Sequence, residues 1–341
     1  MDKLTGEQLG FLKSEGKVVV LACPGSGKTF SVANKLLNYL DNWTDKHRGI
    51  AILSFTNVAS EEIYKKMVSL NINKSIIRYP HYIGTVDSFL NEFIMLRYGY
   101  LKTRDRSRPI IALKNEWKMP FKWRPECHRN KCVDNLDRLH IGLDKQLYNG
   151  KTIVKCIPNV EDNLLPCQQY KIKLHNNNIY FQSDVALFAY ELLKEYPTIA
   201  SAIVERFPII ILDEAQDTSE EQMAVFDLLA ESGIKSMFLV GDPDQAIYEW
   251  RNANPESFIK KIESDSWKCI EFNSNFRSSQ NICNATACFS SFLKGKKTNI
   301  AVGKSKNEIQ KPVILMIKDH EDDKAIKHFL NKCQVDRKST V

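Results

Sequence analysis

The 341-residue sequence predicts an α/β fold built on a parallel sheet, with a second segment inserted into it. Four short apolar runs each lead directly into a polar cluster, and continuous β-branched runs are typical of strands buried on both faces. Helix-like stretches at 32–40 and 220–230 lie between the runs. Ligands bind at the carboxyl ends of strands in open α/β sheets, so the polar clusters predict a site along that edge. The four runs are 18–21, 50–53, 209–212 and 237–240.

The composition is that of a globular chain, with 43% hydrophobic and 26% charged residues. At this length two or three domains are expected. No apolar run approaches the roughly 18 residues of a membrane span, and the N-terminus lacks the layout of a signal peptide. Nine cysteines are scattered along the chain, and a large intracellular protein keeps such thiols reduced. We therefore expect a cytoplasmic protein with no membrane partner.

The first apolar run leads into a glycine-rich segment that fits a phosphate-binding P-loop. Its glycines would let backbone N–H groups wrap the phosphates of ATP. Lys28 would place its ammonium group near the β- and γ-phosphates, and Thr29 would offer its hydroxyl to Mg²⁺. ATP and Mg²⁺ are therefore the predicted cofactors. The segment reads Ala22, Cys23, Pro24, Gly25, Ser26, Gly27, Lys28 and Thr29, with Ala22 where the consensus has its first glycine.

Two later clusters suit the same chemistry. Asp213 follows the third apolar run and can hold the Mg²⁺ shell, while the adjacent Glu214 can deprotonate the attacking water. Gln245, in the cluster after the fourth run, can sense the γ-phosphate. Taken alone, the acidic pair would equally suit a helix N-terminus, and residues 241–245 would suit a solvated turn.

These segments, taken together in order, resemble the motifs of UvrD/Rep/PcrA-type superfamily-one DNA helicases. The resemblance runs from residue 4 to about residue 282, apart from the inserted segment. It departs from the family at Asp87, where histidine is frequent, and at Phe276, where tyrosine is usual. It implies a RecA-like P-loop NTPase sheet. The matching segments are 4–8, 22–29, 54–59, 84–89, 213–217, 240–251 and 275–278.

The resemblance also implies roles for single residues. Gln8 would contact adenine with Phe276 stacked near it, and Gln245 and Arg277 would reach the γ-phosphate, so that Glu214, Gln245 and Arg277 form the catalytic set. Aromatic faces stack on any base and so grip a single strand without reading its sequence. Ordinary core or interface aromatics are the alternative for Tyr248 and Trp250. The implied DNA contacts are Phe55, Thr56, Asn57, Thr85, Tyr248, Trp250 and Arg251.

The segment from 97 to 183 breaks the α/β pattern. Alternation at 170–174 predicts short strands or hairpins there. Residues 102–131 hold ten Lys/Arg against three acidic residues, a net charge of +7 that equals the excess of the whole chain. This insert occupies the position of the family's small accessory domain, so it is expected to contact DNA at the duplex junction. A solvated basic face is the alternative.

A zinc site in the insert is a second hypothesis, carried by four cysteines and one histidine. Their spacing is looser and less regular than that of a typical zinc finger, which favours free thiols. The residues are Cys127, His128, Cys132, Cys156 and Cys167.

Four parts are therefore predicted along the chain. Residues 1–96 and 184–280 form the first RecA-like lobe, residues 97–183 the inserted accessory subdomain, and residues 281–341 the beginning of a second RecA-like lobe. A strand at 312–317 and a helix at 324–330 would start that lobe. Motifs V and VI, which the family carries in the second lobe, do not follow, so the lobe would be incomplete.

The resemblance implies an ATP-dependent motor that moves 3′ to 5′ along single-stranded DNA, in repair, recombination or phage defence. One alternative is a helicase subunit of a nuclease complex or defence system, with a partner chain supplying the nuclease. Another is a nucleotide- and DNA-binding regulatory module without unwinding activity. With a second lobe this short, the chain alone is expected to bind ATP and DNA but to unwind poorly.

Overall fold

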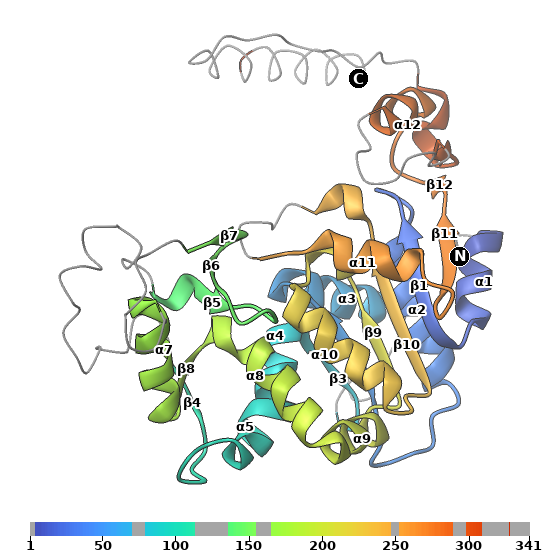
Figure 1. The fold of residues 1–341 in the computed structure, drawn as a ribbon. Helices are drawn as coiled ribbons and strands as arrows, with labels where there is room; N and C mark the ends of the chain where they lie inside the picture. The colour runs from blue at the N-terminus through green and yellow to red at the C-terminus, as the bar shows by residue number, and fades with distance from the viewer. Residues whose placement is uncertain are drawn as a thin grey trace.

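The computed structural model describes residues 4–69, 79–112, 136–154, 165–246, 252–288, 298–308 and 327. A six-stranded parallel sheet forms its centre, with helices on both faces, which confirms the predicted α/β fold class (Figure 1). The strand order is β11-β1-β10-β9-β2-β3. The strands are β1 (Gly16–Ala22), β2 (Ile50–Ser54), β3 (Tyr82–Thr85), β9 (Ile209–Leu212), β10 (Ser236–Gly241) and β11 (Lys268–Phe272).

The four predicted apolar runs all lie in central strands of this sheet. Side chains alternate between its two faces, so Val18 and Val20 enter one core while Val19 enters the other. All three valines are fully buried. Strands covered on both faces have no solvent side, which explains why the runs are continuously apolar.

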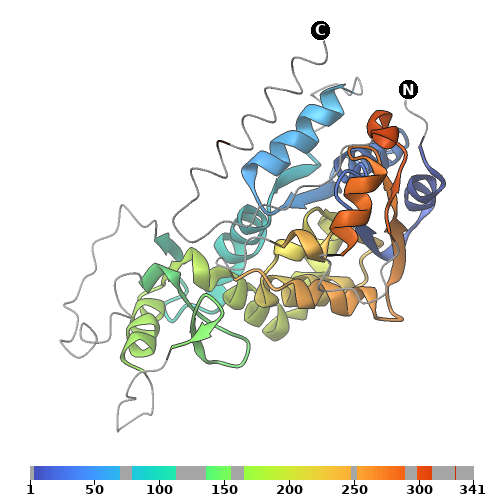
Figure 2. The ribbon, with the colours of Figure 1, turned by 90° about the horizontal axis from the view of Figure 1, so that it is seen from above.

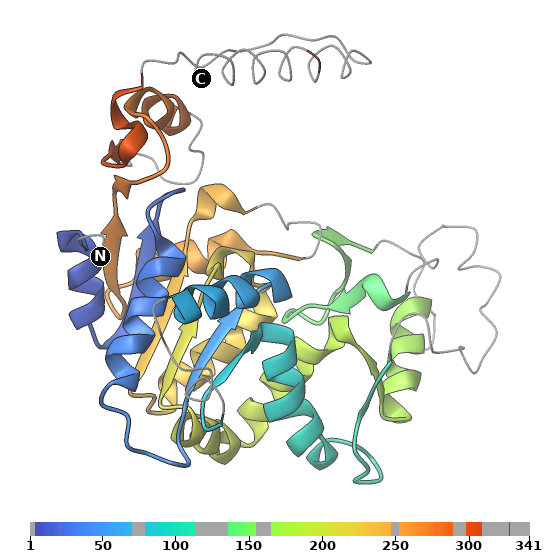
Figure 3. The same cartoon turned by 180° about the vertical axis from the view of Figure 1, so that it is seen from behind.

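Helices cover each face. Figure 1 shows α8, α10 and α11 on the near face, and Figure 3 shows α2 and α3 on the far face. The far-face helices, with α1 beside them, are α1 (Gly6–Lys13), α2 (Lys28–Leu40) and α3 (Asn57–Ser69). The near-face helices are α4 (Val86–Phe89), α8 (Gln182–Glu195), α9 (Pro197–Arg206), α10 (Glu220–Glu231) and α11 (Pro255–Ile262). The α4 helix continues through a π-helical segment (Leu90–Met95) into α5 (Leu96–Tyr98).

The described part of the insert has a small core of its own, which lies to one side of the sheet, opposite α12 (Figure 2). Two strands, β4 (Ile110–Ala112) and β8 (Ile179–Phe181), pair in parallel. Three further strands form an antiparallel sheet: β5 (Leu139–Ile141), β6 (Leu147–Asn149) and β7 (Thr152–Ile153). The four domain boundaries stay a prediction.

The strand predicted at 170–174 is wrong, because these residues lie in helix α7 (Pro166–Asn176). Tyr170 and Leu174, four residues apart, are both buried, as expected for one face of a helix. Lys171 is also buried, and its Nζ lies 2.5 Å from Asp184 Oδ1 on α8. The alternation of polar and apolar residues was therefore misleading, because one lysine of the run is an internal residue.

Helix α8 begins at Gln182. Asp184 lies inside the helix, and its Oδ2 accepts a hydrogen bond from the backbone N–H of Phe181 at 3.0 Å. Asp184 therefore stabilises the first turn from the third helical position.

The chain after the sheet starts a separate pair of strands, β12 (Ser274–Asn275) and β13 (Ile300–Ala301), with α12 (Gln280–Ala287) between them. The predicted strand at 312–317 lies outside the described residues, as does the predicted helix at 324–330 apart from residue 327. Within the described ranges, no helix is long and apolar enough to cross a membrane. Short 3-10 turns occur at Gly99–Leu101, Leu136–Arg138, Ala215–Asp217, Pro243–Gln245 and Lys304–Asn307.

Candidate nucleotide-binding site

The glycine-rich loop joins β1 to the N-terminus of α2, as the P-loop motif predicts. Gly25 and Gly27 have φ angles of +74° and +79°, which disfavour any residue with a Cβ. Gly27 is the N-cap of α2 and has no side chain to cap the helix, so the first backbone N–H groups of the helix stay available. Such a helix N-terminus is an anion-binding arrangement.

Lys28 and Glu214 form an ion pair across the site. Lys28 Nζ lies 2.8 Å from Glu214 Oε2, and the two side chains are 10% and 30% exposed. Glu214 has a left-handed backbone with φ +52°, a conformation that costs energy for a residue with a Cβ and that occurs at functional sites. Lys28 therefore meets a carboxylate at the position where phosphate oxygens would compete for it.

Asp213 directly follows β9 and carries a buried carboxyl group, 2% exposed. Burial, together with the neighbouring Glu214 carboxylate, raises the pKa of Asp213 to about 7. No salt bridge to it occurs within the described residues. A divalent cation would supply the missing positive charge, and Mg²⁺ typically takes one or two carboxylates plus phosphate oxygens and water. Asp213 and Thr29 therefore fit a Mg²⁺ site, although the described residues hold no group of three or more His, Cys, Asp or Glu side chains that could bind a metal by themselves.

A hydrogen-bonded network links Glu214 to Gln245. The Gln216 amide nitrogen donates to Glu214 Oε2 at 2.9 Å, and its Oε1 accepts from the backbone N–H of Asp242 at 3.0 Å. Gln245 Nε2 then donates to Asp242 Oδ2 at 2.7 Å. Sequence reasoning missed Gln216, whose position two residues after Glu214 was the available signal.

Most of the predicted phosphate-site residues line one cavity of about 560 Å³. It contains Gly25 to Thr29 together with Glu214, Gln245 and Arg277, which come from four separate stretches of the chain. Ala22 and Pro24 do not line it; Ala22 is fully buried in β1, and Pro24 is exposed outside the cavity. The lining residues that sequence reasoning did not name are Phe30, Glu62, Lys65, Lys66 and Ser69.

An adjoining cavity of about 550 Å³ brings Gln8 and Phe276 together. It shares Gly27, Phe30 and Lys66 with the phosphate cavity, so the two cavities have part of their lining in common. Phe276 is 39% exposed and offers its ring as a stacking surface. This is the arrangement expected for an adenine pocket beside a phosphate loop.

Gln8 is fixed from two directions. It shares a capping box with Thr5 at the start of α1, and its Nε2 donates to the Ser26 carbonyl of the phosphate loop at 3.1 Å. At the other end of α1, Lys35 is 1% exposed and donates to the carbonyls of Phe11, Leu12 and Ser14. Burial lowers the pKa of Lys35 to about 8. Lys35 therefore caps the helix that carries Gln8.

The predicted DNA contacts fall into two groups. Phe55, Thr56 and Asn57 follow β2, and Thr85 ends β3, where its hydroxyl caps α4. These two strands are neighbours, so their ends lie at one edge of the sheet. Tyr248, Trp250 and Arg251 lie outside the described residues, as do Cys127, His128, Cys132, Cys156 and most of the basic cluster. Cys167 is buried.

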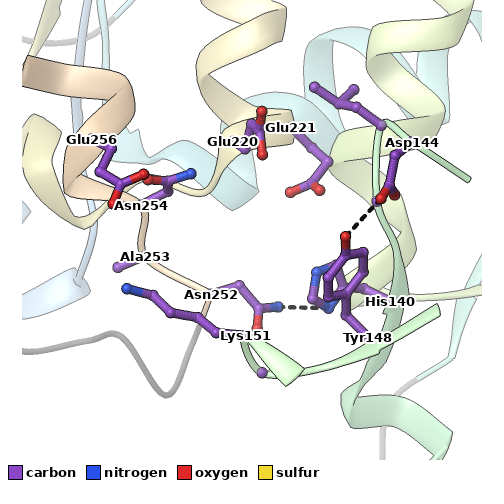
Figure 4. Close-up of a pocket in the computed structure, with 13 residues that line it drawn as sticks. His140, Asp144, Tyr148, Lys151, Glu220, Glu221, Asn252, Ala253, Asn254 and Glu256 are labelled. Carbon is purple, nitrogen blue, oxygen red and sulfur yellow. Dashed lines mark hydrogen bonds between the residues drawn. The ribbon is translucent and has the colours of Figure 1, made fainter. Parts of the chain in front are cut away.

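A third cavity, of about 610 Å³, separates the inserted strands β5–β7 from the starts of α10 and α11 (Figure 4). Asn252 bridges it by a 3.0 Å hydrogen bond to His140 Nδ1. Burial lowers the pKa of His140 to about 4, so the ring is neutral at pH 7 and Nδ1 can accept. The acidic residues on the wall, among them Glu220 and Glu256, lie in first helical turns, where they offset the helix dipole.

Asp217 is expected to make the stability of the ligand-free protein depend on pH. Burial, with the Glu214 charge, raises the pKa of Asp217 to about 7, whereas the unfolded chain has the ordinary low value. The folded protein therefore holds the Asp217 proton more tightly than the unfolded chain does. The contribution of this proton to the free energy of unfolding is complete below the unfolded pKa and is lost as the pH rises to about 7. Asp217→Asn should therefore reduce the fall in unfolding free energy between pH 5 and 7 by up to about 1.4 kcal/mol per pH unit.

Urea unfolding without nucleotide or Mg²⁺ measures this effect. Asp45→Asn is the control, because hydrogen bonds from the Arg48 and His47 backbone lower the pKa of this exposed carboxyl group, so it does not titrate in the window. An Asp217→Asn protein with the wild-type pH dependence would contradict the prediction.

Comparison with known proteins supports the resemblance found in the sequence. The profile of the UvrD/REP helicase N-terminal domain matches residues 4–265. The ATP-dependent DNA helicase Rep of Buchnera aphidicola subsp. Schizaphis graminum is 28% identical over 90% of this chain and 49% of its own length. The Gabija protein GajB of Bacillus cereus is 28% identical over 94% of this chain and 54% of its own.

A third relative matches a shorter stretch. An ATP-dependent helicase/nuclease subunit from Natranaerobius thermophilus is 34% identical over 45% of this chain and 13% of its own length. The chain thus spans about half the length of Rep and GajB.

Proposed function

The chain belongs to the UvrD/REP helicase family, and we propose that it hydrolyses ATP to move 3′ to 5′ along single-stranded DNA. The observation that carries the proposal is the phosphate cavity, in which Lys28, Glu214 and Arg277 meet from distant parts of the chain. Beside it lies the pocket of Gln8 and Phe276, which suits a base. A nucleotide would span both cavities.

In this proposal the bound nucleotide replaces Glu214 as the partner of Lys28. The γ-phosphate pairs with Lys28 and so breaks its ion pair with Glu214. The Glu214 carboxylate is then without its cation and therefore more basic. Glu214 then accepts a proton from the attacking water, and Gln245 and Arg277 donate to the phosphoryl oxygens. Mg²⁺, held by Thr29 and Asp213, would neutralise charge on the phosphates when bound.

In this proposal the single-stranded DNA contacts the ends of β2 and β3 and residues 248–251. Phe55 and Trp250 would stack on bases, and Thr56, Asn57 and Thr85 would contact the backbone. The basic insert would contact the duplex at the junction, since Lys and Arg bind phosphates without reading sequence.

ATP hydrolysis measured with and without single-stranded DNA tests the proposal. Stimulation by DNA is expected from a motor, whereas a regulatory module would hydrolyse ATP slowly whether or not DNA is present. Trp250→Ala should weaken single-strand binding by about 1–3 kcal/mol, the usual loss of one base–aromatic stack.

Trp267→Ala provides the matched control, since Trp267 is a core tryptophan with 7% exposure. Its loss should lower stability without a selective loss of DNA binding. If Trp250→Ala reduced ATP binding as much as DNA binding, Trp250 would have a core role instead.

A second candidate function is that of a helicase component in a nuclease complex or defence system. The similarity to the helicase/nuclease relative from Natranaerobius thermophilus, and to GajB, favours it. Affinity purification of the tagged chain from its own cells distinguishes the two candidates, because a stable nuclease partner would co-purify only with a component of such a complex.

A further inference from the structure

Asn275 joins two parts of the nucleotide site that are 251 residues apart in the chain. Its Nδ2 donates to the carbonyl of Pro24 in the phosphate loop at 2.8 Å. Its Oδ1 accepts the backbone N–H groups of Arg277 and Ser278, both at 2.8 Å. The residue is 4% exposed, so water competes little for these hydrogen bonds.

The backbone repeats this connection. Phe276 donates its N–H to the Gly25 carbonyl at 2.8 Å, and Val302, next to β13, donates to the Asn275 carbonyl at 2.8 Å. A Cβ added to Gly25 would lie 2.7 Å from Arg277 Cβ and 2.9 Å from Asn275 Oδ1. The close approach of the two segments therefore requires glycine at position 25, in addition to its positive φ.

Arg277 itself is exposed at the phosphate cavity. No carboxylate forms a salt bridge with its guanidinium group within the described residues. The point from which its side chain reaches into the cavity is set by its backbone, which Asn275 and the phosphate loop hold in place.

We propose that Asn275 is a positioning residue for Arg277, fastening its backbone to the phosphate loop so that the guanidinium group points at the γ-phosphate. The inference rests on the proposed function, because it requires ATP in the cavity. It predicts that Asn275 matters for the γ-phosphate and not for the rest of the nucleotide. The affinity for a nucleotide that lacks the γ-phosphate should not change when Asn275 is substituted.

Binding of ATP and ADP with Mg²⁺, measured in a Glu214→Gln background that prevents turnover, tests the proposal. Arg277→Ala should lower ATP affinity about tenfold or more, the factor expected for a hydrogen bond to a charged group, and change ADP affinity less than about twofold. Asn275→Ala should give the same pattern. The double variant should bind ATP no more weakly than Arg277→Ala alone, because both changes remove one interaction.

Two further variants sharpen the result. Asn275→Asp keeps the acceptor for Arg277 but loses the donor to Pro24, so it should also bind ATP selectively weakly even if Asn275→Ala folds poorly. Asn273→Ala is the matched control, since its side chain donates to Glu271 on the surface and should not affect either nucleotide.

Additive losses in the double variant, or equal losses of ATP and ADP affinity, would overturn the role of Asn275. Lys28→Ala separates this failure from failure of the proposed function. If Lys28→Ala bound ATP normally, the cavity would not be the nucleotide site at all.

Discussion

Glu214→Gln is expected to reduce ATP turnover by about 10²–10⁴-fold while nucleotide binding is retained. The amide cannot accept the proton of the attacking water, whereas the phosphate loop and Lys28 are unchanged. The ion pair sharpens the expectation, because Lys28 would no longer be held by a carboxylate at 2.8 Å. ATP affinity should therefore stay the same or rise. Single-turnover hydrolysis and equilibrium binding measure the two quantities separately.

Glu62→Gln is the matched control for this change. Glu62 lines the same cavity from α3, so the variant removes a carboxylate from the same cavity without removing the proposed base. It should retain most turnover. Comparable turnover losses in the two variants would show that only the overall charge of the cavity matters, and normal turnover in Glu214→Gln would exclude Glu214 as the base.

Lys171→Met is expected to lower the free energy of unfolding by about 3–5 kcal/mol, because it leaves the buried Asp184 carboxylate without its cation. Lys171 is 0% exposed and its partner Asp184 is 5% exposed. Although burial opposes its ionisation, the Lys171 charge and the His175 ring, whose Nε2 lies 3.3 Å from Asp184 Oδ2, hold the pKa of Asp184 at about 2. Urea denaturation of the variant measures the loss.

The companion variant is Lys171→Met with Asp184→Asn. The amide oxygen can still accept from the Phe181 backbone, and no buried charge remains, so most of the lost stability should return. Lys173→Met, on the exposed side of the same helix, should change stability by less than about 0.5 kcal/mol. A single variant as stable as the wild type would show that Asp184 is satisfied without Lys171.

The sequence predicted the centre of the sheet because its strands are buried on both faces and must be apolar throughout. The edge strands β3 and β11 escaped prediction, since an edge strand tolerates polar residues. In β11, Lys268, Cys269 and Glu271 are exposed. The strand predicted at 170–174 failed for a related reason, because the alternation assumed that Lys171 faces water. Only the tertiary structure, which supplies Asp184, allows that lysine to be buried.

The candidate site could also be predicted only in part from the sequence. The phosphate loop and the Asp213–Glu214 pair are local signals, and the structure places Lys28 and Glu214 in contact. Contacts between distant segments were not predictable, because spacing along the chain says nothing about them. Asn275 lies in the matching segment 275–278, but its hydrogen bond to the Pro24 carbonyl could not be predicted, and neither could the hydrogen bonds from Lys35 to the end of α1.

The parallel pairing of β4 with β8 sets a rule for engineering the insert. Ile110 to Ala112 run in the same direction as Ile179 to Phe181, so chain leaving the first strand must travel back before it enters the second. A tight turn can close only antiparallel strands, whereas parallel neighbours need a crossover. A shortened chain that joins residue 112 to residue 179 by about two or three residues should lose this pairing. The insert can therefore be exchanged for another crossover unit, but it cannot be trimmed to a hairpin.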